Sequence, residues 1–371
     1  MMTNRIRTFY LALLAVALVP TAAMACPICL SGKVVVPAQR IEAADQVVLA
    51  HPDVAPGAYR VAYSIKGDIP VGQVISEVRA MPVAPAASGD LELLVRNKVS
   101  EHWTALGRTR LEVASWLRQL IQAAPVGGAP GWAWPGAPLP PSEADGQAWA
   151  ARLALVAPRL ESSDRLAAAI AFGELARAPY AAMRSLKGAV EPSKAAAWVD
   201  DPALADRRSA YMLLFGVVGG PAEGETVGAA LGRLAAANEE TDLAAILAAD
   251  LELGGPSRLW WIEETYLGTV PRKLTEIEAV LLALGVQGTA DAAVPRGDIV
   301  HVYRRFVRHD PAMAGFVAPN LAEWQDVSAA DDMEAALRSG TINDPGSQFA
   351  VLSYLRDARS PRRAASIADP H

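Results

Sequence analysis

The segment at 206–220, which reads DRRSAYMLLFGVVGG, constrains the fold more than any other part of the chain. Its apolar residues recur at the spacing i, i+3, i+4 and i+7, which is typical of one face of a helix. These residues are Ala210, Leu213, Leu214 and Val217. Met212 and Phe215 make the opposite side apolar, and a helix that is apolar on most sides is buried. We therefore predict a buried helix, capped at its start by Asp206, with other elements packed around it.

Similar apolar periods run through the rest of the second half of the chain, so we predict an all-helical domain with short connections. The expected helices are 147–155, 163–177, 192–199, 206–218, 223–236, 239–252, 256–267, 273–284, 298–308, 311–317, 321–338 and 347–356. A loose echo recurs in LAAAIAFGELA (166–176), SAYMLLFGVVG (209–219) and EAVLLALGVQG (278–288). The echo suggests stacked helical pairs of the HEAT kind. An irregular α-domain is the alternative, because the spacings are uneven.

The first part of the chain has a strand-like pattern instead. Short runs rich in Val, Ile and Tyr are separated by turn residues, which is typical of small β-domains. The expected strands are 33–36, 46–50, 59–65, 73–78, 91–96 and 103–108. Five or six short strands in so few residues predict a small barrel or sandwich. Of the two we expect a small β-barrel, closed by an amphipathic helix at 111–122.

The predicted protein is therefore of the α+β class, with a small N-terminal β-barrel followed by the helical domain. Residues 125–146 are dense in Pro and Gly and have no apolar period, so a linker is expected between the two. The predicted divisions are a signal peptide at 1–25, the barrel with its helix at 26–122, the linker at 123–146, the helical domain at 147–358 and a disordered tail at 359–371.

The N-terminus has the pattern of a secretory signal peptide. Arg5 and Arg7 precede a short apolar run at 10–19, and Ala23-Met24-Ala25 has the small residues that a signal peptidase cleaves after. The run is shorter than the roughly 20 apolar residues that span a bilayer, so we expect no transmembrane segment in the mature chain. The prediction is export to the periplasm or beyond, with a lipoprotein anchored at Cys26 as the alternative.

The only two cysteines, Cys26 and Cys29, follow the predicted cleavage site. In an oxidising compartment, a close pair of this kind predicts a structural disulfide. A redox-active dithiol is an alternative, although the helix N-terminus that activates such a thiol is not expected here. Metal binding is a further alternative, but two sulfurs provide only half of a structural zinc site.

Two groups of side chains are candidates for binding. The first follows one predicted helix and could hold an anion or an acidic partner; its members are His301, Arg304, Arg305 and Arg308. The same residues could instead form a solvated face that pairs with Asp298 and Asp310. The second group is aromatic and consists of Trp132, Trp134, Trp260 and Trp261. Each tryptophan could contact a ligand, or it could pack against the helical domain, as large apolar side chains commonly do.

Nothing in the sequence matches a nucleophile elbow, a phosphate-binding loop or a dinucleotide-binding fingerprint. We therefore predict no catalytic residues, no metal site and no cofactor. The formal net charge of −6 argues against nucleic acid as a partner, because nucleic acid attracts basic surfaces. The expected function is that of an exported, non-enzymatic binding or scaffolding protein, whose partner is another protein or a component of the cell envelope.

Four stretches carry a resemblance: the start CPIC, the strands with DQVVLA and VAYSIKGDIPVGQVI, and PNLAEWQD at 319–326. They resemble a loose group of uncharacterised exported bacterial proteins with a CPxC start, a small β-barrel and HEAT-like helices. The barrel part is also similar to the netrin-like, OB-type domains of tissue inhibitors of metalloproteinases. Those inhibitors begin Cys-x-Cys, whereas this chain has Cys-x-x-Cys and no further cysteine. The resemblances leave two alternative functions: a thiol–disulfide protein and a metalloprotease-inhibitor-like module.

Overall fold

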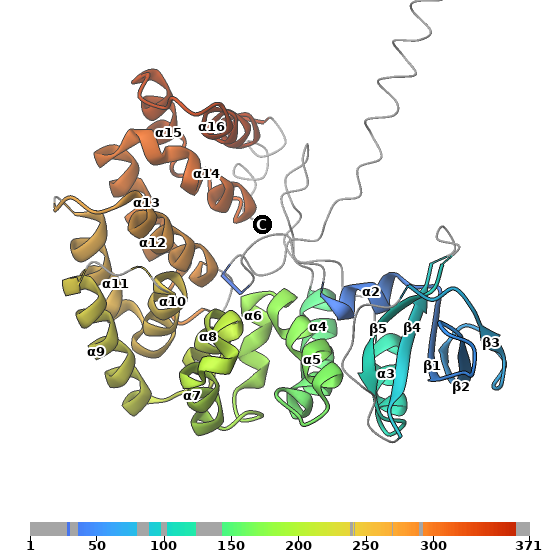
Figure 1. Cartoon of the computed structure of the whole chain (residues 1–371). Helices are drawn as coiled ribbons and strands as arrows, with labels where there is room; N and C mark the ends of the chain where they lie inside the picture. Colours follow the sequence, from blue (N-terminus) through green and yellow to red (C-terminus); the bar gives the residue numbers. More distant parts are fainter. Residues whose placement is uncertain are drawn as a thin grey trace, which may run out of the picture.

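The computed structural model describes residues 28–29, 36–79, 89–97, 102–123, 143–237, 240, 242–268, 270–288 and 292–360. These residues form an α+β fold in which a small antiparallel sheet is followed by a long series of helices (Figure 1). The predicted α+β class, with a small β region followed by helices, is therefore confirmed. The division into domains stays a prediction, because most of the expected linker lies outside the described residues.

The sheet has five strands in the order β3-β2-β1-β4-β5, and every neighbouring pair is antiparallel. The strands are β1 (Gln46–Pro52), β2 (Tyr59–Lys66), β3 (Val74–Ile75), β4 (Leu91–Arg96) and β5 (Thr104–Thr109). The edge strands β3 and β5 do not pair with each other, so the predicted closed barrel is wrong. In the described part of the chain after β3, an isolated bridge joins Arg79 to Thr104 of β5.

The reason for the open edge lies in the segment expected to be a strand at 73–78. Only Val74 and Ile75 are extended in the ladder, because Gly72 and Glu77 both have positive φ angles, of 86° and 60°. Left-handed backbone interrupts a strand on either side. The expected strand at 33–36 also fails at its only described residue, since Val36 caps the first turn of α2 (Pro37–Ala43).

The central strands are buried on both faces: β1 has the apolar run Val47–Ala50, and β4 is apolar except for Glu92, which is buried, and Arg96. On one face, Val48 and Leu94 belong to a small core of their own with Trp103. On the other face, Val47 and Leu93 join a core that continues through the helices. Helix α3 (Val113–Gln122) packs against β2, and α5 (Arg165–Arg177) packs against both β5 and α2. Sheet and helices therefore share one apolar core.

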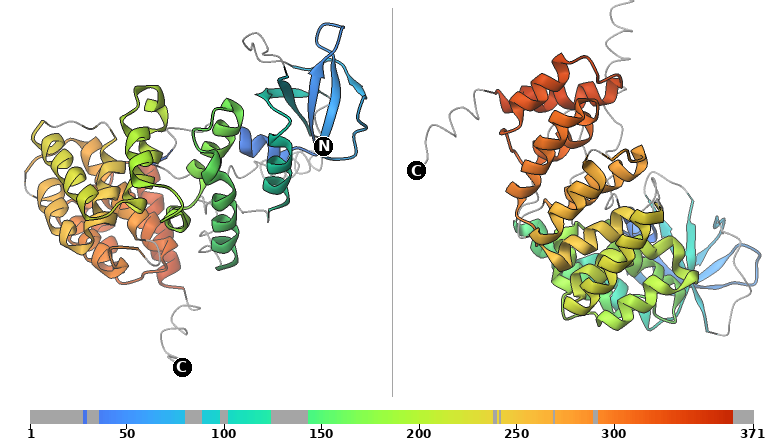
Figure 2. Two further views of the ribbon diagram at one scale, coloured as in Figure 1. Left: turned by 90° about the horizontal axis from the view of Figure 1, so that it is seen from below. Right: turned by 90° about the vertical axis from the view of Figure 1, so that its left-hand side faces the viewer.

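The helices that follow lie along an arc (Figures 1 and 2). Helix α10 contacts both α8 and α12, while α14 contacts α12 and α16. Helices α7 and α9 pack beside α8 and α10 respectively. The main elements are α4 (Glu143–Val156), α6 (Tyr180–Met183), α7 (Pro192–Asp200), α8 (Arg208–Val218), α9 (Pro221–Ala237), α10 (Leu243–Gly254), α11 (Pro256–Ile262), the π-helix η5 (Glu263–Leu267), α12 (Leu274–Gln287), α13 (Arg296–His309), α14 (Ala314–Glu323), α15 (Ala330–Arg338) and α16 (Pro345–Ala358). Short 3-10 turns join several of them: η2 (Ala157–Arg159), η3 (Arg184–Leu186), η4 (Pro202–Arg207) and η6 (Pro311–Met313).

Most of the expected helices form, and α8 is buried along nearly its whole length as predicted. Two details of the sequence analysis are wrong. The expected helix at 321–338 is two helices, α14 and α15, because Gln325 takes a positive φ of 57° between them. Asp206 does not cap α8, since it lies within the 3-10 turn η4 and the N-cap residue is Arg207. None of the described helices is long and apolar enough to cross a membrane.

The central glycines of the sequence echo lie at close contacts between elements. The three glycines lie on α5, α8 and α12. A Cβ atom on Gly216 would lie 2.7 Å from the Cα atom of Ala249 on α10. A Cβ atom on Gly285 would lie 2.5 Å from the Asn320 side chain on α14, and one on Gly173 would lie 2.9 Å from Val36. The echo therefore coincides with tight packing at equivalent points of α5, α8 and α12.

Candidate functional site

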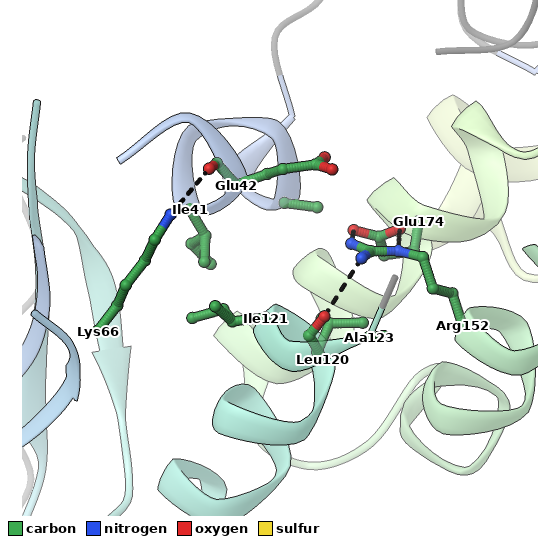
Figure 3. A pocket seen from close by; sticks show the side chains of 9 residues that line it. Ile41, Glu42, Lys66, Leu120, Ile121, Ala123, Arg152 and Glu174 are labelled. Carbon is green, nitrogen blue, oxygen red and sulfur yellow. Dashed lines mark hydrogen bonds and ion pairs between the residues drawn. The ribbon is translucent and has the colours of Figure 1, made fainter. Parts of the chain in front are cut away.

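A cavity of about 170 Å³ lies where the sheet meets the helices (Figure 3). We call it the junction cavity. Residues from α2, β2, α3, α4 and α5 form its walls. The apolar lining comes from Ala38, Ile41, Leu120, Ile121 and Ala123, and the polar lining from Glu42, Lys66, Arg152 and Glu174. A cavity with apolar walls and a few placed polar groups is typical of small-molecule sites.

One end of the junction cavity is closed by a buried ion pair. Arg152 donates from Nε and Nη2 to the two carboxylate oxygens of Glu174, at 3.1 and 2.8 Å. Its Nη1 donates to the backbone oxygen of Leu120 at 3.2 Å. The side chains of Arg152 and Glu174 are 4% and 0% exposed. Bidentate geometry of this kind is the strongest form of ion pair and fixes the guanidinium in one orientation.

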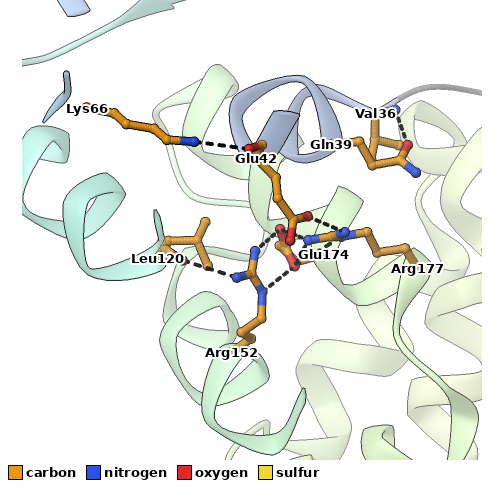
Figure 4. Close-up of polar contacts among 8 residues, drawn as sticks. All are labelled: Val36, Gln39, Glu42, Lys66, Leu120, Arg152, Glu174 and Arg177. Atoms are coloured by element: carbon orange, nitrogen blue, oxygen red, sulfur yellow. Dashed lines mark hydrogen bonds and ion pairs between the residues drawn. The ribbon is translucent and has the colours of Figure 1, made fainter. Parts of the chain in front are cut away.

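The ion pair continues into a network behind the cavity (Figure 4). Arg177 donates to both oxygens of Glu174 from the other side, at 2.8–3.2 Å, and pairs with Glu42 at 2.6 Å. Its guanidinium also lies 5.3 Å from the ring centre of Trp149. Burial acts to lower the pKa of Arg177, but Glu174 and Glu42 outweigh it and raise the pKa overall. Arg177 is therefore charged, and the two acids balance the two arginines.

At the other end of the cavity lies Lys66. Its Nζ atom donates to the backbone oxygen of Glu42 at 3.1 Å, so the ammonium is held at the end of α2 (Figure 3). Among the residues that the structure describes, no carboxylate lies within 4.0 Å of it. The five charged side chains at this junction thus carry one positive charge in excess.

The predicted basic face on α13 exists, but its members point to different acids. Arg304 and Arg308 both contact Asp332 on α15, at 2.7 and 3.1 Å. Arg305 pairs with Glu263 on the π-helix at 2.6 Å, and His301 is exposed. The acids expected from the sequence, Asp298 and Asp310, are not the partners of these arginines in the described part of the chain.

A second cavity of about 160 Å³ lies beside the Arg305–Glu263 pair, and Phe306 and His309 also line it. One turn before Glu263 along the chain, Trp260 is 69% exposed. Its neighbour Trp261 packs instead against Tyr266 and beneath Arg258, with the ring centres 6.1 Å apart and the guanidinium 4.8 Å away. The two adjacent tryptophans therefore differ, since one is available to a partner and the other packs against the protein.

Three candidates, Trp132, Trp134 and Cys26, lie outside the described residues. Cys29 is described: it is 2% exposed and is not a free thiol. The predicted pairing of Cys26 with Cys29 stays a prediction. Among the described residues, no group of His, Cys, Asp and Glu side chains could hold a metal ion.

The sequence analysis did not single out Lys66, Arg152 or Glu174. A signal for Glu174 was present, because it stands in the otherwise apolar run LAAAIAFGELA, where a charged residue indicates a buried ion pair. Lys66 ends an alternating strand and carries no comparable signal. Comparisons of the chain with protein-family models, with curated proteins and with solved structures find no match.

Proposed function

We propose that this chain is an exported, non-enzymatic binding or scaffolding protein whose helical domain is a HEAT-like array. The observation that carries the proposal is the order of helix contacts. Helices α8, α10, α12, α14 and α16 contact one another in succession, and they lie along an arc (Figure 1). Arrays in which each unit contacts mainly its neighbours create extended curved surfaces, and such proteins use these surfaces to recognise partners.

The equivalent glycines of α8 and α12 support a repeated arrangement. Gly216 faces α10 and Gly285 faces α14, so each removes a side chain at the contact with the next-but-one helix. Small residues at such points let helix backbones approach closely. The same construction at two places along the arc is what a repeated helical pair requires.

The best-supported surface for a partner surrounds Trp260. This side chain is 69% exposed, and the second cavity with Arg305 and Glu263 lies one helical turn away along the chain. Tryptophan and arginine are the residues that most often dominate binding energy at protein interfaces. We propose another protein, or a component of the cell envelope, as the partner.

The two alternative functions have less support. A redox-active pair needs an accessible thiolate at its first cysteine; Cys26 lies outside the described residues, and no described contact supports an activated thiol at Cys29, which is buried in the main core. The inhibitor-like function depends on a netrin-like barrel, whereas the sheet is open between β3 and β5.

Site-specific photo-crosslinking in exporting cells tests the binding function. A photoreactive amino acid replaces Trp260 in one variant and, as the matched control, Arg338, whose side chain is 70% exposed on α15. We expect a crosslinked product of discrete mass at position 260 and none at position 338. Equal labelling at both positions, or no product at position 260, would contradict the proposed surface.

A further inference from the structure

We propose that the junction cavity binds a small organic monocarboxylate, whose apolar body lies against Ile41, Leu120 and Ile121 and whose carboxylate pairs with Lys66. This site lies at the sheet, apart from the surface around Trp260, and it goes beyond the binding function proposed above. Three independent features of the cavity support it: its charge, its walls and its size.

The net charge of the side chains around the cavity favours a ligand with one negative charge. Glu174 and Glu42 are both engaged by arginines, at 2.8 and 2.6 Å. Lys66 is the remaining cation, and its one described contact is to the uncharged backbone oxygen of Glu42. An ammonium that is partly removed from water is stabilised by an opposite charge. One carboxylate would neutralise the cluster, and a dianion would leave it negative.

The apolar walls of the cavity favour a ligand that carries an apolar group next to its carboxylate. Ile41 and Ile121 lie between Lys66 and the Arg152–Glu174 pair (Figure 3). Leu120 and Ala38 complete this apolar stretch. Burying an apolar group against these side chains is favourable, because it removes apolar surface from water. A small inorganic anion would leave these side chains uncovered, so an organic acid is the better fit.

The size limits the body to about one ring. An apolar cavity of about 150 Å³ is known to accept benzene, and the junction cavity measures about 170 Å³. The Arg152–Glu174–Arg177 network holds α4 and α5 at fixed positions behind it. The cavity is therefore preformed, and a preformed site loses little affinity to the ordering of its own side chains.

Calorimetric titration of the full exported chain tests this proposal, with benzoate as the probe and benzamide as its uncharged counterpart of the same shape. We expect saturable binding of benzoate and at least about tenfold weaker binding of benzamide, because the uncharged amide loses the ion pair with Lys66. The variant Lys66→Gln should lose at least about tenfold in benzoate affinity. The matched control Lys194→Gln removes an exposed lysine from α7 and should bind as the parent does.

A second variant, Ile121→Trp, keeps Lys66 and fills the cavity from a partly exposed position. Ile121→Trp should abolish benzoate binding, so it still tests the proposed site if Lys66→Gln does not fold. The proposal is overturned if the parent chain does not bind benzoate, if benzamide binds as tightly, or if either cavity variant retains the parent affinity. None of these results bears on crosslinking at position 260, so the two proposals fail or succeed separately.

Discussion

Replacing Glu174 by glutamine tests how the sheet and the helices are joined. The carboxylate is fully buried and accepts hydrogen bonds from two guanidinium groups, at 2.8 Å from Arg152 and 2.8 Å from Arg177. Their side chains are only 4% and 6% exposed. In Glu174→Gln, two buried positive charges would face each other with Glu42 as the one remaining acid of the network.

The expected cost follows from the desolvation of those charges. Breaking a buried ion pair by removing one partner costs about 3–5 kcal/mol, because the remaining charge is left uncompensated. We therefore expect Glu174→Gln to lower the free energy of unfolding by about that amount. Urea unfolding followed by tryptophan fluorescence measures it, with Trp149 beside Arg177 as a local reporter.

Two controls distinguish the effect of leaving a buried charge without a partner from the effect of removing any charge. Glu263→Gln breaks the pair with Arg305, whose side chain is 53% exposed, and it should cost about 1 kcal/mol or less. The combined replacement Arg152→Met, Glu174→Leu and Arg177→Met removes all three charges and should be close to neutral, as apolar replacement of buried ion pairs often is. A loss below about 1 kcal/mol in Glu174→Gln would refute the reasoning, since the arginines would then be adequately solvated without the acid.

Three further predictions concern packing, pH and export. In urea unfolding, Gly216→Ala should lower the free energy of unfolding by about 1–3 kcal/mol, because the added Cβ would lie 2.7 Å from Ala249. The control Gly232→Ala on α9 meets no atom within 4 Å and should raise the free energy of unfolding by about 0.5–1 kcal/mol. Equal effects of the two replacements would contradict the close approach of α8 and α10. Burial acts to raise the pKa of Glu252, but hydrogen bonds from Arg184, Gln287 and Tyr180 outweigh it and lower the pKa below 4.5. The charged form of Glu252 is therefore favoured in the folded state, so Glu252→Gln should have a lower free energy of unfolding than the parent at pH 7. This difference between variant and parent should shrink as the pH falls below about 4.5. A difference that stays constant down to pH 3 would rule out this linkage. Mass spectrometry of the exported protein should find a chain that begins at Cys26 and whose two cysteines resist alkylation until they are reduced; retention of residues 1–25 would contradict the signal peptide.

The sequence by itself determined the local structure wherever a regular apolar period was long enough. The period of α8 predicted its buried face, and the alternation along β2 predicted its strand. The echo in the sequence contains Gly216 and Gly285 at equivalent positions, although it gave no indication of the residues that they approach. These features are local, because the backbone geometry of a helix or strand fixes which nearby side chains share a face.

Only the tertiary structure decided what lies opposite those faces. The partners of Arg304 and Arg305 are 28 and 42 residues away in the chain, and the nearby acids Asp298 and Asp310 gave no indication of them. The open edge of the sheet depends on the positive φ of Glu77, which a strand-like composition does not reveal. The junction cavity combines side chains from five separate elements. Periodicity specifies the direction of a side chain relative to its own element, whereas pairing, closure and cavities depend on how distant elements pack together.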